Sequence, residues 1–482
     1  MPRRVRSRLL PEWRDPEAVF RARFADAPYA VWLDGGADAV SGVSVLASAH
    51  ARSEFVTADV ARATVTRSTP MGAETSDVAL EASVFDVLGE RLTGALDESG
   101  IRALAGPLGW FGWFGYELGA RLNEVPIDEA ATPDAAFLFV DRALVFDHAA
   151  RSVQLVWLEA DPAETGEAWP SPDAWADDLE SAIDSLDGSP AERPRDDPGP
   201  HRAPTVRWRH DAARYAELIA ECQAAIIRGD AYQLCLTNRV DVDVRPDPAA
   251  TYLALRASSP SHHGGYLRFG AFALLSASPE QFLLVSADGV VSTKPMKGTR
   301  PRGADAAEDE ALRRELIESE KERAENLMIV DLMRNDLGRV AELGTVSVPS
   351  LLEVEEYPHV HQLVSTVQAR LRHPLTALDV VQAAFPAGSM TGAPKRSAMT
   401  ILHELEQGPR GVYSGAFGYL GVDGTADLAM VIRSIVLTPG GASIGTGGGI
   451  TALSIAEEEI EETRVKARAL LDVLAGAIPA VE

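Results

Sequence analysis

Lys297 lies in the stretch "KPMKGTRPRG", residues 294–303, and could act as a nucleophile, as an anion-binding charge or as an ordinary solvated lysine. A lysine amine attacks an electrophile only when it is neutral, so its pKa must fall from about 10.4. Partial burial and the neighbouring cations Lys294 and Arg300 would lower the pKa in this way. Judged alone, a lysine in such a sequence is most often exposed to solvent.

Two pairs of glutamates have the spacing of a helical face. Glu322 and Glu325 are three residues apart in "EKERAENLMIVDL", and Glu459 and Glu462 repeat that spacing in "AEEEIEETRVKAR". Residues three apart project from the same side of a helix, so each pair could converge on one ligand. Carboxylate oxygens are ligands that Mg²⁺ prefers. The alternative is two solvated helix faces, which are common in a chain this acidic.

Two glycine-rich stretches could hold an anion through their backbone N–H groups. They are "FPAGSMTGAPKRSAM", residues 385–399, which leads into a predicted helix, and "IGTGGGI", residues 444–450. A helix N-terminus favours a carboxylate or phosphate. Neither stretch has the spacing of a Walker or dinucleotide-binding loop, so nucleotide binding is disfavoured. As isolated patterns, both predict plain turns.

The whole chain must position these residues, and its composition limits the function. With 482 residues, of which 46% are hydrophobic, it can bury a large core. Acidic residues outnumber basic ones by 71 to 45, so the net charge of −26 opposes binding to nucleic acid or anionic lipid. Cys222 and Cys235 lack the spacing of a metal site, which favours a reduced, cytoplasmic protein. No apolar run has the length of a membrane span or of a signal peptide.

The order of elements favours an α+β fold with antiparallel sheets. Short apolar runs such as "YAVWLDGG" and "AAFLFVDRALVF" predict a sheet-rich region over residues 1–186. The Pro-rich and charged residues 187–207 predict an exposed linker, and residues 208–482 form the remaining region. There, a helix ending at Gly229 precedes the strand "AYQLCLTNRVDVDV", and a hairpin is predicted to turn at Asp288-Gly289.

Seven ordered blocks then resemble the chorismate-utilising enzymes: "PMKGTRPRG", "AENLMIVDLMRNDLGRV", "VHQLVSTV", "FPAGSMTGAPK", "GVYSGAFGYLG", "MVIRSIVL" and "GTGGGIT" followed by "EEEIEETRVKA". The blocks cover roughly residues 210–470, and a weaker likeness to the N-terminal region of anthranilate synthase component I precedes them. The resemblance implies two large antiparallel sheets, interleaved and packed face to face, with helices on the outside.

Lys297 selects one branch of this family. Members that form anthranilate typically have Ala at this position, whereas members that form 4-amino-4-deoxychorismate have Lys, as in "PMKGT" here. The resemblance implies that Lys297 attacks C2 of chorismate and that ammonia then attacks C4, in a step towards p-aminobenzoate and folate. Glu280, in "SASPEQF", matches the acid/base glutamate of the family, although Gln281 replaces the usual Arg.

The resemblance also implies a cofactor and a substrate pocket. Mg²⁺ would be bound directly by Glu325 and Glu462, and through water by Glu322 and Glu459. The residues matching the pocket of the family are Arg433, Tyr413, Ser389, Gly298, Thr299, Lys466, Lys395 and the backbone of Gly447 and Gly449.

Neither cysteine lies in the G-x-C-x-G elbow of glutaminases, and the resemblance implies that ammonia comes from a separate glutaminase subunit. Where anthranilate synthases have His before "LVS", this chain has Gln362, with His361 one residue earlier, which agrees with a product that keeps its enolpyruvyl group. Asp34-Gly35 replaces the Glu-Ser that helps to bind tryptophan in regulated relatives, so regulation by tryptophan is not expected. The alternatives are an anthranilate-forming or water-adding relative and a non-catalytic homologue.

Overall fold

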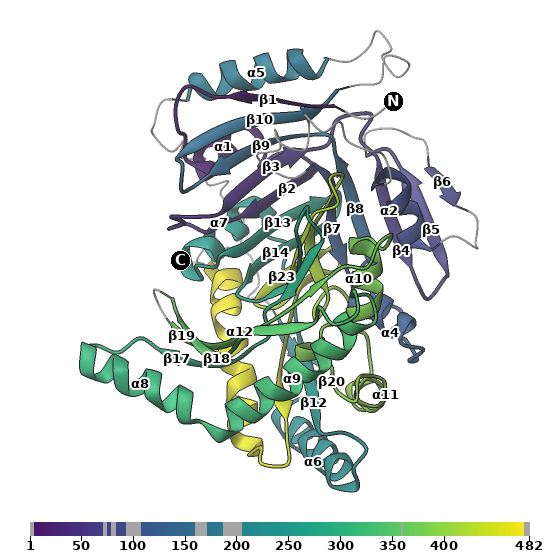
Figure 1. Ribbon diagram of the computed structural model, residues 1–482, viewed down its shortest axis with the longest axis vertical. Helices are drawn as coiled ribbons and strands as arrows, with labels where there is room; N and C mark the ends of the chain where they lie inside the picture. The colour runs from purple at the N-terminus through teal and green to yellow at the C-terminus, as the bar shows by residue number, and fades with distance from the viewer. Residues whose placement is uncertain are drawn as a thin grey trace.

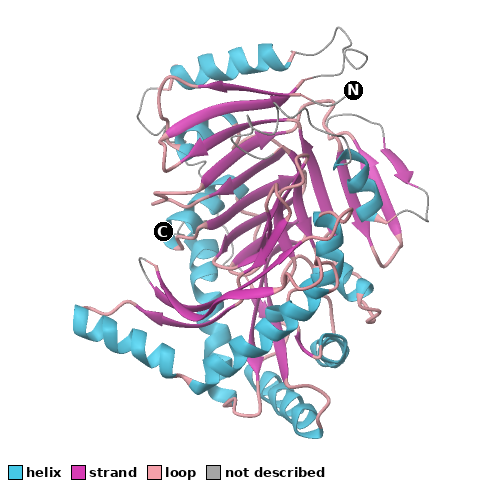
Figure 2. Ribbon diagram, in the orientation of Figure 1, coloured by secondary structure: helices cyan, strands magenta, loops and turns pink. Residues whose placement is uncertain are grey.

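Two large antiparallel sheets form the centre of the molecule (Figure 2). The structure is a computed structural model that describes residues 4–70, 75–78, 83–92, 108–159, 171–186, 205–357 and 360–476. Over these ranges each sheet has 12 strands, and all their pairings are antiparallel. The predicted fold class is confirmed.

In both sheets, strands that are distant in the sequence lie side by side. In spatial order, sheet I contains β1 (Val5–Leu9), β10 (Ser152–Leu158), β9 (Arg142–Asp147), β3 (Val43–Ser48), β2 (Tyr29–Asp34), β13 (His263–Phe269), β14 (Phe272–Ser278), β23 (Ser434–Thr438), β24 (Gly441–Ile450), β12 (Gln233–Val242) and β11 (Val206–Trp208), with β20 (Gly392–Ala393) paired to β12. In the same way, sheet II contains β17 (Met296–Pro301), β19 (Val360–Arg370), β16 (Val290–Thr293), β15 (Gln281–Val285), β22 (Ala426–Met430), β21 (Ala416–Gly421), β7 (Gly109–Phe114), β8 (Ala135–Val140), β4 (Phe55–Asp59), β5 (Thr64–Ser68) and β6 (Thr75–Val78), with β18 (Ser347–Glu356) paired to β19.

The two halves of the chain are interleaved, because each sheet takes strands from both. In sheet I the halves meet where β2 pairs with β13, Trp32 lying opposite Tyr266. In sheet II they meet where β7 pairs with β21, Gly112 lying opposite Gly418. The boundaries of the predicted regions remain a prediction, since residues 187–204 of the proposed linker lie outside the described residues.

Between β8 and β9 the chain passes from one sheet to the other across a single residue. The run "AAFLFVDRALVF" supplies β8 to sheet II and β9 to sheet I, with Asp141 alone between them. The Asp141 carboxylate accepts a hydrogen bond from Arg142 Nε at 3.1 Å and lies 3.1 Å from His50 Nε2. These contacts anchor the corner between the sheets.

Apolar side chains from the facing surfaces form the core between the sheets. They include Val31 and Leu267 from sheet I and Phe111 and Leu138 from sheet II. The sheets approach closely at Gly265, where a β-carbon would lie 2.2 Å from Phe417 Cε2 on the opposite sheet. Gly265 therefore allows the phenyl ring to pack against the backbone of β13.

The helices lie outside the sheets (Figure 1). Those packed on sheet I are α1 (Pro16–Arg23), α5 (Pro172–Asp184), α7 (Pro248–Ser258) and α12 (Ala456–Gly476). Those beside β12 are α6 (Ala212–Arg228) and α11 (Lys395–Glu406), and those on sheet II are α2 (Val84–Leu92), α9 (Glu320–Gly338) and α10 (Ala377–Ala384). The others are α4 (Tyr116–Leu122), α8 (Ala306–Glu318) and the short helix η1 (Gly388–Met390). Among the described helices, none is long and apolar enough to cross a membrane.

Several local predictions can be checked against these bounds. α6 ends with Gly229 in the left-handed conformation (φ 84°), and β15 and β16 form the hairpin around Gly289, as predicted. The stretch "IGTGGGI" is different, because residues 444–450 belong to β24 and not to a turn. Glycine is favoured at these positions because other atoms lie where side chains would project from both faces of the strand.

Candidate active site

Lys297 and Gly298 form a β-bulge in β17. Met296 lies opposite Val364 and Thr299 opposite Gln362, so the two bulged residues face Leu363 alone. Gly298 has φ 84°, and a β-carbon there would lie 2.8 Å from Leu316 Cδ1 and 3.1 Å from the carboxyl carbon of Glu322. A bulge re-aims the side chain it carries, and here only glycine fits its second position. Thr299, the next residue, is exposed.

The Lys297 amine has no hydrogen bond or ion pair with any described residue, but carboxylates surround it. Burial opposes its charge, yet nearby Glu325, Cys235 and Glu280 outweigh burial and raise its pKa above the ordinary value. The predicted fall in the pKa of Lys297 is therefore wrong. The cations expected to cause it are engaged elsewhere: Lys294 pairs with Glu355 at 3.1 Å, and Arg300 pairs with Glu315 at 2.9 Å.

Glu280 and Ser389 lie together near Lys297. Glu280, just before β15, is 7% exposed, and burial raises the pKa of its carboxyl, although Ser389 and Lys297 act in the opposite direction. The Ser389 hydroxyl, in η1, is buried and has no hydrogen-bond partner within 3.5 Å among the described residues. A carboxyl with a raised pKa can donate a proton, and an unpartnered hydroxyl can bind a substrate.

The four predicted metal-binding glutamates come from two helices, as expected. Glu322 and Glu325 lie in α9, and Glu459 and Glu462 lie in α12. Both helices reach β24: a β-carbon at Gly449 would lie 3.3 Å from Glu325 Oε2, and one at Gly448 would lie 2.9 Å from Glu459 Oε2.

Lysines pair with two of these four glutamates. Lys321 pairs with Glu459 at 3.1 Å, and Lys466 pairs with Glu462 at 2.5 Å. Glu325 is 6% exposed and forms no ion pair with a described residue. Burial raises its pKa to about 6, an increase to which Glu322 also contributes.

These residues suit a hard divalent cation chemically. Within the described parts of the chain, no three acidic, histidine or cysteine side chains are close enough together to coordinate a metal. Nevertheless, Glu325 is a buried carboxylate that lacks a direct counter-ion, and Glu322 and Glu459 nearby supply further carboxylate oxygens. This donor set is the type that Mg²⁺ prefers.

The edge of β24 presents backbone donors to the same region. Gly447 and Gly449 lie opposite Thr237 and Cys235 of β12. The backbone of those two residues bonds away from β24, because Thr237 N donates to Glu406 and Cys235 N donates to Thr391 O. Residues opposite each other in an antiparallel pair turn either both inward or both outward, so the N–H groups of Gly447 and Gly449 point away from β12. On that side β23 pairs with β24 only as far as Ile444, which leaves this part of the edge free.

Lys466 and two further residues border this edge. Lys466 Nζ donates to Gly447 O at 2.8 Å. Arg433 is exposed, has φ 50° and forms no side-chain hydrogen bond or ion pair with a described residue, so its guanidinium is free to bind a carboxylate. Tyr413 is 8% exposed, and its ring occupies the space where a β-carbon at Gly445 would lie, 1.9 Å from Cγ.

Two other residues singled out in the sequence point elsewhere. Lys395 is buried and donates to Asp336 and to Ala384 O, both at 2.7 Å, so its amine stabilises packing between helices. His361 is also buried, and its Nε2 lies 2.9 Å from Asp309.

Asp34, at the position that helps to bind tryptophan in regulated relatives, forms hydrogen bonds within the chain. Asp34 accepts hydrogen bonds from Arg256 Nε at 2.6 Å and from Tyr252 at 3.0 Å. That tryptophan does not regulate the protein stays a prediction.

Sequence reasoning missed three residues of the site. Cys235 and Lys297 perturb each other's pKa, Lys321 pairs with Glu459, and the Gln233 side chain is buried at Gly449 with Oε1 unpartnered among the described residues. Lys321 could have been found, because it lies one turn before Glu325 in the same helix. Cys235 and Gln233 come from β12, whose pairing with β24 has no local signal.

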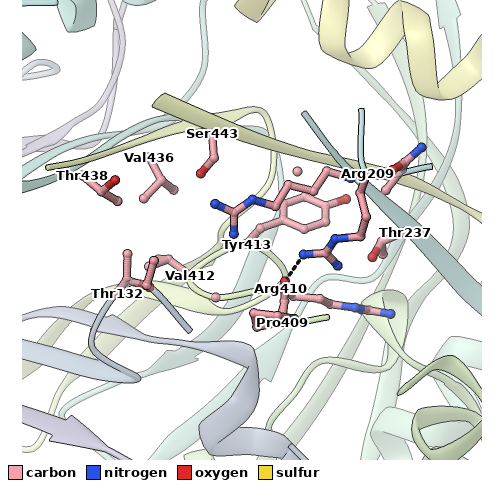
Figure 3. Close-up of a pocket in the computed structure, with 15 residues that line it drawn as sticks. Thr132, Arg209, Thr237, Pro409, Arg410, Val412, Tyr413, Val436, Thr438 and Ser443 are labelled. Atoms are coloured by element: carbon pink, nitrogen blue, oxygen red, sulfur yellow. Dashed lines mark hydrogen bonds between the residues drawn. The ribbon is translucent and has the colours of Figure 1, made fainter. Parts of the chain in front are cut away.

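A pocket lies beside Tyr413 (Figure 3). Arg209, Thr237 and Ser443 also line it, and Arg209 donates to Gly408 O at 2.9 Å and to Pro409 O at 2.5 Å. Lys297, Glu280 and the four glutamates are not part of its lining. Of the predicted site residues, Tyr413 alone lines it.

Comparison with known proteins identifies the family. A family model described as "chorismate binding enzyme" matches residues 29–472, so the chain belongs to this family of enzymes. The chain is 42% identical to an aminodeoxychorismate synthase from Streptomyces griseus and 43% identical to one from Streptomyces pristinaespiralis, over 100% and 95% of its length. It spans 66% and 64% of those relatives.

Anthranilate-forming relatives are also similar. Anthranilate synthase component 1 from Streptomyces coelicolor is 41% identical over 75% of this chain and 72% of its own length. Among solved structures, anthranilate synthase component I from Streptococcus pneumoniae matches with a TM-score of 0.73 and 29% identity, covering 92% of both chains. The fold predicted from the motifs is therefore that of known members of the family.

Proposed function

We propose that this protein converts chorismate and ammonia to 4-amino-4-deoxychorismate, with Lys297 as a covalent catalyst. The observation that carries the proposal is the Lys297 amine, which a bulge presents without a bonding partner beside Glu280 and Glu325. Glutamine-derived ammonia would come from a separate glutaminase subunit, and the product would serve p-aminobenzoate and folate synthesis. The two free cysteines agree with a cytoplasmic protein.

The reaction begins with a proton transfer between two coupled groups. In the starting state that we propose, Lys297 carries the proton and Glu280 is the base. Burial raises the pKa of Glu280, so this carboxyl can take the proton from the amine, which creates the nucleophile and the acid together. The amine attacks C2, the ring double bond shifts, and the C4 hydroxyl leaves as water with the proton from Glu280. The new secondary ammonium then returns a proton to Glu280.

Ammonia completes the exchange at C4. Its nitrogen attacks C4, the double bond shifts back, and the C2–N bond breaks, so that Lys297 leaves with the proton held by Glu280. The nitrogen that has bonded to C4 passes one proton to the released Lys297 amine as it becomes the product amine, which restores the starting protonation of the enzyme. The sum is chorismate plus ammonia giving the amino product plus water, which requires no oxidant or reductant.

Substrate binding follows from the charges around this centre. We assign Mg²⁺ to Glu325 and Glu462 directly and to Glu322 and Glu459 through water. When bound, Mg²⁺ would hold the ring carboxylate and offset the carboxylates that keep Lys297 protonated. The free guanidinium of Arg433, with Tyr413 and the N–H groups of Gly447 and Gly449, would bind the other carboxylate. Gly298, Thr299, Ser389 and Lys466 complete the pocket.

A second candidate is an anthranilate-forming activity, which the 41% identity to anthranilate synthase component 1 favours. Its product lacks the enolpyruvyl group and carries nitrogen at C2, so chemical analysis separates the two.

The test is to incubate the purified chain with chorismate, Mg²⁺ and ammonium and to identify the product by mass and ultraviolet spectrum. We expect 4-amino-4-deoxychorismate. Anthranilate would support the second candidate, a nitrogen-free isomer of chorismate would indicate a water-adding enzyme, and unchanged chorismate would reject all three activities.

A further inference from the structure

Asn326 connects the helix of the carboxylates to the strand that carries Lys297. It follows Glu325 in α9, and its side chain is fully buried, with 0% exposed. Its amide nitrogen lies 3.3 Å from Pro295 O and 3.4 Å from Leu363 O, and its Oδ1 accepts a hydrogen bond from Ser365 Oγ at 2.6 Å. Both nitrogen partners are carbonyl oxygens, which can only accept, so the amide orientation is fixed.

These two carbonyls flank the bulge on both strands. Pro295 lies just before β17, two residues ahead of Lys297, and Leu363 is the single residue opposite the bulge. Ser365 N also donates to Pro295 O at 3.1 Å. Residues two apart in a strand direct their backbone groups to the same edge, so Leu363 O also faces the bulged strand.

Ser365 fixes the asparagine in turn. Its hydroxyl donates to Asn326 Oδ1 and accepts from Leu352 N at 2.9 Å, so it links α9 to β18 and β19. The side-chain amide of Asn326 therefore uses both donors and one acceptor on named partners. A bulge disrupts the regular ladder, and an amide fixed in this manner can restore rigidity at that point.

We propose that Asn326 is a positioning residue for Lys297: with Ser365 it holds the bulge against α9 and thereby fixes the amine relative to Glu325. This inference rests on the proposed function, in which Lys297 forms a bond to chorismate. We call the hydrogen bonds of Asn326 and Ser365 the clamp. Its loss should slow formation of the bond between Lys297 and chorismate more than it weakens chorismate binding, because a displacement of about 1 Å can cost about a hundredfold in rate.

Two variants test the clamp, each with a matched control. Asn326→Asp keeps the shape but places an oxygen against the two carbonyls, and Ser365→Ala removes only the hydroxyl that orients the amide. Asn238→Asp changes another buried asparagine that donates to a backbone carbonyl, that of His210 at 2.8 Å. Ser276→Ala changes another buried serine, which accepts from Ser434 at 2.8 Å.

The main measurement is the rate at which the Lys297–chorismate adduct forms with Mg²⁺ and without ammonia, followed by intact-protein mass after rapid denaturation. We expect a loss of about a hundredfold in Asn326→Asp and a smaller loss in Ser365→Ala, with the chorismate dissociation constant little changed. Both controls should react like the wild type. Should Asn326→Asp fail to fold, Ser365→Ala decides, and a wild-type rate in the folded variants overturns the inference.

A second measurement separates this inference from the proposed function. Acetic anhydride labels amines without metal or substrate, and peptide mass spectra give the labelling rates of Lys297 and Lys294. We expect the variants to change the rate at Lys297 alone. Absence of any wild-type adduct would reject the covalent mechanism, whereas unchanged labelling of Lys297 in both variants would reject the clamp.

Discussion

At the scale of single residues, the charge on Lys297 is the central question. Carboxylates surround the amine, and they raise its pKa even though burial opposes the charge. The same fields act on Glu280, whose pKa is raised by burial and held back by Lys297. The two groups therefore compete for one proton, and the state needed for attack is reached when that proton lies on Glu280.

Replacing Lys297 by alanine removes the nucleophile but leaves the glutamates and Arg433. We expect Lys297→Ala to bind chorismate while C4 amination falls by orders of magnitude, since no covalent route remains. Ammonia could then attack C2 directly and give the 2-amino isomer. Product analysis and chorismate titration check this, with Lys294→Ala as the control, because Lys294 is paired with Glu355. Normal C4 amination by Lys297→Ala would defeat the mechanism.

The role of the glutamates in binding Mg²⁺ can be tested without measuring catalytic turnover. Glu325→Gln and Glu462→Gln should each weaken Mg²⁺ binding by at least the roughly 10- to 100-fold that loss of a supporting partner costs. Unfolding should be unaffected, since α9 and α12 keep their apolar contacts. Calorimetric titration with Mg²⁺ measures the affinity, and Glu320→Gln, an exposed change in the same helix, serves as the control. Unaltered Mg²⁺ affinity in both variants would contradict the metal assignment.

At the scale of elements, β24 shows how glycine allows close packing. Gly445→Ala would place a β-carbon on the Tyr413 ring, and the overlap should cost about 1–3 kcal/mol of unfolding free energy. Because the ring must move, chorismate affinity should fall as well. Gly338→Ala, in α9, meets no atom within 4 Å and should leave both quantities nearly unchanged. Denaturant unfolding and chorismate titration measure the two effects, and an equal response of both variants would refute this role of Gly445.

Glu117 ties α4 to the turn before Tyr413, and its pKa gives a pH prediction. Its carboxyl accepts from Arg410 N at 2.7 Å and Gly411 N at 2.9 Å, and burial raises its pKa from 4.5 to about 8. The folded state therefore retains the proton between these values while the unfolded state loses it. The contribution of Glu117 is full below pH 4.5 and is lost as pH rises through about 8.

The measurement is the unfolding free energy from pH 4 to 9 for the wild type and for Glu117→Gln. We expect stability to fall with pH more steeply in the wild type than in the variant across this window, because only the wild type can ionise there. Parallel curves of unfolding free energy against pH for the two proteins would show that Glu117 does not titrate in this pH window.

The sequence predicts elements better than their contacts. The helix ending at Gly229 and the hairpin at Gly289 have local signals, namely a C-terminal glycine and a two-residue turn, and both are present. The glycine content of residues 444–450 predicts a turn because glycine is rare in strands, but Tyr413 and Glu325 require the absence of side chains there.

Predictions for the site fail where distant segments decide the outcome. The neighbours of Lys297 in sequence, Lys294 and Arg300, predict a lowered pKa, yet Glu325 and other groups that are distant in the sequence raise it. The bulge at Lys297 depends on the register of β19, and the role of Asn326 depends on the bulge. Neither could be inferred from residue spacing.

At the scale of the whole molecule, the two halves complete each other's sheets. Pairing at β2–β13 and β7–β21 joins them through backbone hydrogen bonds and through the core between the sheets. A specific protease site placed within residues 187–204 should therefore yield two fragments that co-elute in native buffer and retain Mg²⁺ binding. Size-exclusion chromatography checks this, with the uncut protein as control. Separation of the fragments before denaturant is added would show that the halves are independent.

The corner at Asp141 has a consequence for how such chains can evolve. One residue separates strands that belong to different sheets, and alternate residues of each strand face the core. An inserted or deleted residue between 135 and 147 would exchange the two buried faces of β8 or β9, of which one packs in the core between the sheets and the other in the core beneath the outer helices. Natural variation in length should therefore be absent from this corner, and a survey of gaps among relatives would reveal it as a segment of invariant length even where its residues differ.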